Sequence, residues 1–297
     1  MAMDLYGQFV GLLGGGLSPR EPVSATRLET TELPAYRRER VILQAGNRLI
    51  PQYILYPKVD GRLPAILAHH QHAGEYHLGK SEVVGIAGNP SMRYAAHLAE
   101  HGYVVAAWDA LGFEERNNPL FGRSYEHFLA GQALAEGACL EREYILDTMY
   151  VTDYLLTLPE VNPKAIGTIG HSLGGQNALF TLLADERVTV GVASCGIGTV
   201  RSFIEDSIVH NPAWYLPGIL KIGDTPALAP LLAGKSLFIS QGASDAIFPL
   251  RGVLAFAEAA KIHANVKLHV FEGGHSFPPE AQRMAWEFFD EYLSAQV

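Results

Sequence analysis

The sequence GHSLG at residues 170–174 restricts the possible fold classes of this chain more than any other stretch. It has the pattern G-x-S-x-G and stands between an apolar run at 166–169 and a segment of helical periodicity at 173–184. A strand, a sharp turn and a helix in this order lift a serine hydroxyl clear of the sheet edge. Ser172 is therefore a candidate nucleophile, and the alternative is an ordinary serine that caps a helix.

Short apolar runs alternate with longer helical patterns around this stretch, which is typical of a parallel sheet with crossover helices. We expect strands at 40–43, 52–56, 65–68, 103–108, 166–169, 188–193, 236–240 and 266–271. Helices are expected at 91–101, 143–158, 173–184, 250–261 and 279–293. Gly46-Asn47 between the first two strands indicates a hairpin turn. The predicted fold class is α/β, with about eight strands in a mostly parallel sheet and helices on both faces.

The chain carries no internal repeat, low-complexity tract or Gly/Ser-rich linker, so one catalytic domain at 37–297 is expected. Residues 1–36 are interpreted as an N-terminal extension that either packs on the core as a helix or mediates a dimer contact. Two long connections, 110–138 and 196–234, interrupt the alternation of strands and helices. Connections of that length usually form functional loops or caps, and we expect 196–234 to be a small cap.

Composition excludes several classes of protein. The chain has 297 residues and a formal net charge of −9, which argues against nucleic acid because phosphate contacts need clustered cations. It is 48% hydrophobic and 18% charged, which favours a large core over disorder. We expect no membrane-spanning helix and no secretion signal, since no sufficiently long apolar run is present. Cys139 and Cys195 do not suggest a disulfide framework, so a cytoplasmic protein is expected.

Two further strand ends carry the residues that a catalytic serine needs. Asp245 follows the seventh expected strand, and His275 follows the eighth. Ligand sites in open α/β sheets lie beyond the carboxyl ends of the strands, so Ser172, Asp245 and His275 should converge at one edge. There, His275 would take the serine proton and Asp245 would orient its imidazole. The Leu173 amide, at the start of a helix, would receive the oxyanion.

The acid and the base also have simpler interpretations. Asp245 could be a turn residue, and His275 could be the neighbour of a helix cap. Asp109 also follows a strand and competes for the role of the acid. It precedes Ser172, whereas the order nucleophile, acid, base places the acid after the serine, so we interpret Asp109 as structural.

With this order of motifs, the chain resembles the α/β-hydrolases, and more narrowly the dienelactone-hydrolase-like and acetyl-xylan-esterase-like serine hydrolases. The resemblance covers roughly 37–293 and is carried by residues 170–174, Asp245 after Gln241-Gly242, His275 after Gly273-Gly274, and 109–113. It implies acyl transfer to Ser172 followed by hydrolysis. Dienelactone hydrolases proper use a cysteine nucleophile, so the serine of this chain does not imply lactone specificity.

The resemblance also implies a second oxyanion donor in the loop after the third strand, at residues 69–74. We expect the Gln71 amide to be this donor. The histidines of this region raise the alternative of a metal site; they stand at positions 69, 70, 72 and 77. Adjacent residues on an extended segment point to opposite faces, and no nearby cysteine or carboxylate pair completes a ligand shell. No metal and no cofactor are expected.

The two long connections are expected to build the substrate pocket. Phe113 in the first, and Trp214 and Tyr215 in the second, are candidate substrate-binding residues, and a buried satellite cluster is the alternative for the second connection. An anionic substrate would need a local cation such as Arg116 or Arg123, because the overall field is repulsive. Ordinary solvated charge is the alternative for both arginines.

These features predict a serine esterase that cleaves a small or medium carboxylic ester through an acyl-enzyme on Ser172. A peptidase or amidase with the same triad is the nearest alternative. A catalytically idle scaffold that binds a ligand or a partner is the other. The expected partner is a small-molecule ester, with neither nucleic acid nor membrane, and the sequence leaves a homodimer open.

Overall fold

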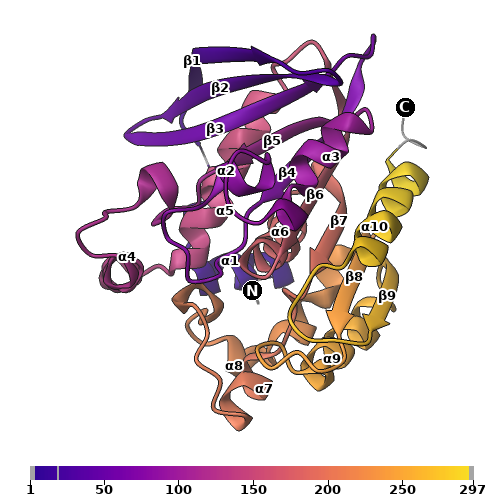
Figure 1. The fold of residues 1–297 in the computed structure, drawn as a ribbon. Coiled ribbons are helices and arrows are strands. Elements are labelled where there is room, and N and C mark those ends of the chain that lie inside the picture. Colours follow the sequence, from indigo (N-terminus) through magenta and orange to yellow (C-terminus); the bar gives the residue numbers. More distant parts are fainter. Residues whose placement is uncertain (1–3, 19, 294–297) are drawn as a thin grey trace.

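Strand β6 (Val161–His171) lies in the middle of a nine-stranded sheet with the order β1-β2-β3-β5-β4-β6-β7-β8-β9 (Figure 1). The computed structural model describes residues 4–18 and 20–293. Six strands run parallel, namely β4 (Leu63–His69), β5 (Val104–Trp108), β6, β7 (Val188–Ser194), β8 (Ser236–Gly242) and β9 (Asn265–Phe271). Helices cover both faces of most of these strands, which is why the central ones are nearly continuous in apolar residues.

The other three strands form an antiparallel end of the sheet. They are β1 (Val23–Glu32), β2 (Tyr36–Ala45) and β3 (Arg48–Pro57), and β3 joins the parallel part by pairing antiparallel with β5. The predicted turn between β2 and β3 is confirmed, with Gly46 at a φ of 56°. Positive φ is costly for residues with a Cβ, and glycine adopts it freely.

The number of strands and the first boundary differ from the prediction. Strand β1 lies within the segment interpreted as an extension, so the boundary after residue 36 separates two strands that pair along most of their length. Most of β1 is exposed on both faces. It therefore lacks the apolar alternation by which a half-buried strand is predicted.

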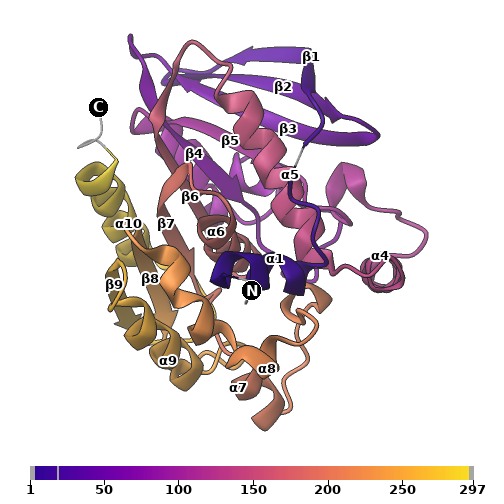
Figure 2. The ribbon, with the colours of Figure 1, turned by 180° about the vertical axis from the view of Figure 1, so that it is seen from behind.

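Two layers of helices sandwich the sheet (Figures 1 and 2). One layer holds α3 (Tyr94–Glu100) and α10 (Pro279–Tyr292), which share a buried cluster with one face of the strands. The other holds α1 (Leu5–Leu13), α5 (Leu140–Leu155), α6 (Leu173–Ala184) and α9 (Leu250–Ala260). Phe9 and Leu13 of α1 are fully buried, so this part of the first 36 residues packs on the core.

Both long connections contain helices of their own. The first includes a short 3-10 helix at Glu114–Arg116 and α4 (Arg123–Ala135), which the sequence did not predict. The second contains α7 (Val200–Glu205), α8 (Ile219–Ile222) and 3-10 helices at Pro212–Trp214 and Thr225–Leu232. Further short helices are α2 (Lys80–Val83) and a 3-10 turn at Pro90–Met92. Across the described residues, none of the helices is both long and apolar enough to span a membrane.

Candidate active site

Ser172 sits on the sharp turn between β6 and α6, with φ 57° and ψ −120°. Such a conformation costs a non-glycine residue about 1–3 kcal/mol and persists only where its surroundings enforce it. Here the enforcement is close backbone packing. A Cβ added to Gly170 would lie 2.2 Å from the carbonyl carbon of Gly174, and one added to Gly174 would lie 2.3 Å from the His69 carbonyl oxygen. The strand, turn and helix predicted for residues 166–184 are therefore present.

His275 and Asp245 lie at the ends of the two neighbouring strand–loop segments and bond each other. The distance from His275 Nδ1 to Asp245 Oδ2 is 2.9 Å. Asp245 Oδ1 accepts hydrogen bonds from the backbone amides of Ile247, at 2.8 Å, and Phe248, at 3.0 Å. Burial alone would raise the pKa of Asp245, but the His275 contact and these amides lower it to about 2. Asp245 is therefore a carboxylate at neutral pH.

A cavity of about 420 Å³ joins Ser172 and His275. Ten of its fifteen lining residues have polar or charged side chains, whereas apolar atoms contribute the larger part of the exposed wall. Its lining consists of Gln71, His72, Ala73, Gly74, Tyr76, Arg123, Glu126, His127, Ser172, Val209, His210, Asn211, Pro212, Ile247 and His275. The structure thus brings three predicted residues, Ser172, His275 and Gln71, to one cavity, with Asp245 bonded to His275.

The predicted oxyanion donors come from two adjacent elements. Leu173 is the first residue of α6, so its amide is one of the helix N–H groups that have no intrahelical acceptor. Gln71 follows β4 and lines the cavity. The close approach of Gly174 to the carbonyls of His69 and His70 holds the loop after β4 against the start of α6.

The histidines of this loop bond protein groups individually. The Ala110 amide donates to His70 Nε2 at 3.0 Å, and burial lowers the pKa of His70 to about 4, which keeps its ring neutral. His72 Nε2 lies 3.1 Å from Glu126 Oε2, and the Gly74 amide donates to His72 Nδ1 at 3.0 Å. These bonds use both ring nitrogens of His72 and anchor the loop.

Two groups of side chains in the described residues lie close enough together to hold a metal ion. They are Cys195, Asp245 and His275, and Asp109, Glu114 and Glu115. In the first group, burial raises the pKa of the Cys195 thiol to about 12, so the thiol is protonated at neutral pH and is a poor ligand. In the second, Lys80 Nζ lies 2.7 Å from each of the three carboxylates and supplies the cation itself. The competing acid Asp109 thus belongs to a buried ion cluster.

The aromatic residues predicted to bind substrate do not line this cavity. Phe113 is fully buried and stacks on Tyr76, with ring centroids 5.2 Å apart. Trp214 is also fully buried, 5.3 Å from the Phe203 ring. Tyr215 is 40% exposed and its hydroxyl accepts from the backbone amide of His210. Burial of apolar area places the first two behind the cavity wall. The prediction that they contact the substrate is therefore wrong, and they support the wall instead.

Of the two arginines considered for an anionic substrate, only Arg123 lines the cavity. Arg116 is buried and donates to Asp147 and to the Asp109 carbonyl. His210 and Tyr76 also line the cavity and were not predicted from the sequence. The polar tip of a long loop, as at His210, is the signal that could have suggested one of them.

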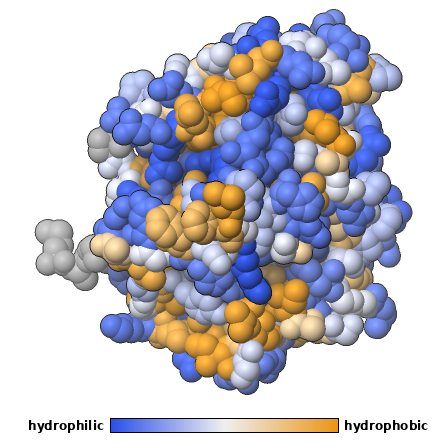
Figure 3. All heavy atoms as spheres, turned by 60° about the vertical axis from the view of Figure 1, so that its left-hand side comes forward, coloured by the Kyte–Doolittle hydropathy of each residue, from blue (hydrophilic) through white to orange (hydrophobic). Residues whose placement is uncertain are grey.

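The side of the molecule that carries α4 borders the cavity (Figure 3). Apolar side chains form separate islands among polar ones on this face. Strongly exposed apolar residues occur on both connections that build the wall, at Leu120, Phe128 and Val209, with exposures of 88%, 63% and 83%. Of these three residues, Val209 lines the cavity and adds to the apolar part of its wall.

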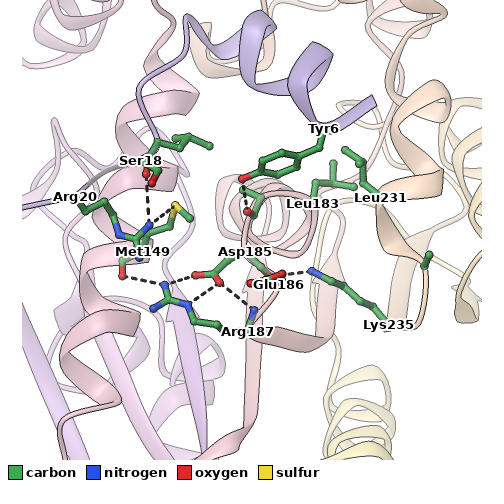
Figure 4. A pocket seen from close by; sticks show the side chains of 13 residues that line it. Tyr6, Ser18, Arg20, Met149, Leu183, Asp185, Glu186, Arg187, Leu231 and Lys235 are labelled. Atoms are coloured by element: carbon green, nitrogen blue, oxygen red, sulfur yellow. Dashed lines mark hydrogen bonds and ion pairs between the residues drawn. The ribbon is translucent and has the colours of Figure 1, made fainter. Parts of the chain in front are cut away.

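A second cavity, of about 550 Å³, lies at the opposite edge of the sheet, where β7 and β8 begin (Figure 4). Several of its charged groups bond other groups of the protein. Arg187 pairs with Asp185 at 2.6 Å and with Asp153 at 2.5 Å, and Lys235 Nζ donates to the Asp185 carbonyl at 2.8 Å. Tyr6 donates to the Ala184 carbonyl. This cavity contains no serine–histidine–carboxylate set, so the candidate active site is the first one.

The fold and the strained serine turn define the class of the protein as an α/β-hydrolase. The chain belongs to the prolyl oligopeptidase family, whose model matches residues 90–296. A Bacillus subtilis protein named as a hydrolase, YtaP, is 29% identical over 244 residues, which cover 80% of each chain. A Saccharomyces cerevisiae protein named as a carboxymethylenebutenolidase is 28% identical over 153 residues, 46% of each chain.

Solved structures of esterases share the fold. Acetyl xylan esterase 1 of Thermoanaerobacterium sp. has a TM-score of 0.70 at 17% identity and covers 97% of this chain and 92% of its own. A glucuronoyl esterase from Solibacter usitatus has a TM-score of 0.70 at 15% identity, over 97% and 91%. The α/β-hydrolase fold and the hydrolase class predicted from the sequence are confirmed.

Proposed function

We propose that this protein hydrolyses small, polar carboxylic esters through an acyl-enzyme on Ser172. The observation that carries the proposal is the bonded pair of His275 and Asp245, with His275 and the strained Ser172 on one cavity wall. Asp245 accepts a hydrogen bond from the protonated Nδ1 of His275, which leaves Nε2 unprotonated and able to act as a base. A small ester suits the cavity of about 420 Å³.

The reaction follows from these positions. Ser172 Oγ attacks the ester carbonyl carbon while His275 Nε2 takes the hydroxyl proton. The oxyanion that forms accepts hydrogen bonds from the Leu173 and Gln71 amides. The intermediate collapses as His275 returns the proton to the leaving alkoxide. Water then attacks the acyl-enzyme with the same proton transfers and releases the acid.

The nature of the substrate is supported by the lining of the cavity. Ten of its lining residues have polar or charged side chains, which can hydrogen-bond a polar substrate, and the apolar part of the wall can contact short alkyl groups. The structural neighbours named above are esterases, which favours an ester over an amide. The family takes its name from peptidases, so an amide is the competing substrate. Cytoplasmic location, a homodimer and the absence of a cofactor stay predictions.

The test is a paired assay with the wild type and the variant Ser172→Ala. We expect hydrolysis of p-nitrophenyl acetate to exceed that of an aminoacyl p-nitroanilide, and the variant to lose both activities. Ser124→Ala is the matched control, because Ser124 is an exposed serine beside the cavity wall. A fluorophosphonate probe should label the wild type and the control but not Ser172→Ala. Undiminished turnover in Ser172→Ala, or no labelling of the wild type, would reject the proposal.

A further inference from the structure

His210 forms a part of the cavity wall that the reaction outlined above does not use. It lies between α7 and the 3-10 helix at Pro212–Trp214. Its ring packs against two buried aromatic rings, with centroid distances of 4.1 Å to Phe203 and 4.6 Å to Phe248. The Trp214 ring is a third neighbour, with its centroid 5.9 Å from that of His210. The aromatic residues of the cap therefore fix the plane of the His210 ring.

The next residue fastens the segment to the helix that begins at the serine turn. Asn211 Nδ2 donates to Gln176 Oε1 of α6 at 3.1 Å. Gln176 is fully buried and donates in turn to Glu141 Oε2 of α5 at 2.6 Å. His210 is thus held relative to Ser172 through side chains that are themselves bonded and buried.

The protonation of His210 follows from its partner and its burial. Nε2 lies 2.9 Å from the carbonyl oxygen of Ile247. A carbonyl can only accept, so Nε2 carries a proton and donates it. Burial lowers the pKa of His210 to about 4, which makes the ring neutral at pH 7. A neutral imidazole has one proton, so Nδ1 presents a lone pair.

That lone pair is open to a ligand. Within the part of the chain that the structure describes, the bonds of His210 are those of its backbone amide to Tyr215 and of Nε2 to Ile247. Nδ1 is not among the buried polar atoms that lack a partner, so solvent reaches it. His210 and Ser172 line the same cavity, so an acceptor nitrogen belongs to a ring that is held in a fixed plane at this wall.

We propose that His210 is a specificity-determining residue, whose Nδ1 accepts a hydrogen bond from a hydroxyl group of the ester substrate. The inference rests on the proposed function and names its substrate class more closely, as esters that carry a hydroxyl near the scissile bond. A hydroxyl is favoured over an ammonium because Arg123 shares the cavity and repels a cation, and because the carboxylate of Glu126 is already bonded by His72 and Tyr76. An ester without the hydroxyl leaves Nδ1 unpaired when it expels water.

The experiment compares esters of equal size that differ by one hydroxyl. Ethyl hydroxyacetate against ethyl propanoate probes the acyl side, and 2-hydroxyethyl acetate against propyl acetate probes the alcohol side. kcat/KM is measured at constant pH, and each ratio is divided by the ratio for hydroxide-catalysed hydrolysis. We expect the wild type to prefer the hydroxylated member of one pair by about threefold to tenfold, the range of one neutral hydrogen bond. In His210→Phe that ratio should fall to about one.

His210→Gln is the conservative variant, because its amide can donate to Ile247 and still present an oxygen. It should keep part of the preference. Wild-type ratios near one in both pairs, or an unchanged ratio in His210→Phe, would overturn the inference. If His210→Phe does not fold, His210→Gln and the ¹⁵N shifts of the wild-type ring decide. A protonated Nδ1 would then refute it. Loss of all hydrolysis in Ser172→Ala tests the proposed function separately.

Discussion

Replacing Asp245 with asparagine should reduce activity strongly while it leaves the fold intact. Asp245 Oδ1 accepts from the backbone amides of Ile247 and Phe248, so the carbonyl oxygen of an asparagine must take that place. Its NH₂ group then faces His275 Nδ1, at the position of Oδ2. Since NH₂ only donates, Nδ1 must accept, and the ring proton moves to Nε2. His275 can then no longer take a proton from Ser172.

The size of the loss has two parts. The first is the charge of Asp245, which the His275 contact and the backbone amides favour against burial. A hydrogen bond to a charged group contributes about 1.5–3 kcal/mol, so losing it beside a developing imidazolium should lower the rate roughly tenfold to a hundredfold. The wrong tautomer adds to this, and the same replacement in serine proteases reduces kcat about 10⁴-fold. We therefore expect kcat for p-nitrophenyl acetate to fall between about 10² and 10⁴-fold.

Asp245→Ala is the matched comparison. Alanine leaves the amides of Ile247 and Phe248 without their acceptor, at a cost of about 1–3 kcal/mol for each buried group. The alanine variant should therefore unfold at lower urea than the asparagine variant. The asparagine variant should nevertheless be no more active, because alanine leaves both tautomers of His275 available. An asparagine variant within tenfold of the wild type would refute the role assigned to Asp245.

Three further outcomes follow from single residues. Arg123→Leu should lower kcat/KM for monomethyl succinate about tenfold or more relative to methyl butyrate, because it removes a charge-assisted bond; equal losses for both esters would contradict this. Gly174→Ala should fail to fold or lose most activity, since its Cβ would lie 2.3 Å from the His69 carbonyl oxygen, whereas Gly131→Ala in α4, with open space around it, should raise the unfolding midpoint slightly. The folded state lowers the pKa of His210 from 6.5 to about 4. As the pH falls below 6.5, the unfolded chain therefore binds this proton before the folded chain does, and the free energy of unfolding decreases. Relative to His210→Phe, the wild type should lose about 2–3 kcal/mol between pH 6.5 and 4 in urea titrations.

The parts of the fold that could be predicted are those in which local chemistry and burial agree. The turn at Ser172 follows from two glycines between an apolar run and a helical pattern, and each of these signals lies within a few residues. Strand β1 could not be predicted in this way, because its edge position leaves most of its side chains exposed. Its pairing with β2 depends on backbone hydrogen bonds, and the hydropathy pattern of the side chains does not report these.

The cavity wall was harder to predict than the turn, for a physical reason. Aromatic residues in the two long connections indicated a pocket, but the hydrophobic effect that gathers Phe113 and Trp214 there also buries them. The side chains left facing the cavity are the polar ones beside them, such as His210 and Tyr76. Which polar residue occupies the wall depends on the packing of segments far apart in sequence.

The loop after β4 shows how such packing determines the chemistry of the site. Three of its side chains are bonded by three different elements: His69 by Thr168 of β6, His70 by the amide of Ala110 after β5, and His72 by Glu126 of α4. Chelating a metal would break these bonds, whereas keeping them fixes the backbone of Gln71 between two anchored neighbours. Three of the four histidines that suggest a metal site in the sequence, His69, His70 and His72, are thus better explained as anchors of the amide that we propose as the oxyanion donor. Helix α4, within the long connection after β5, is then part of what holds the Gln71 side of the cavity in place.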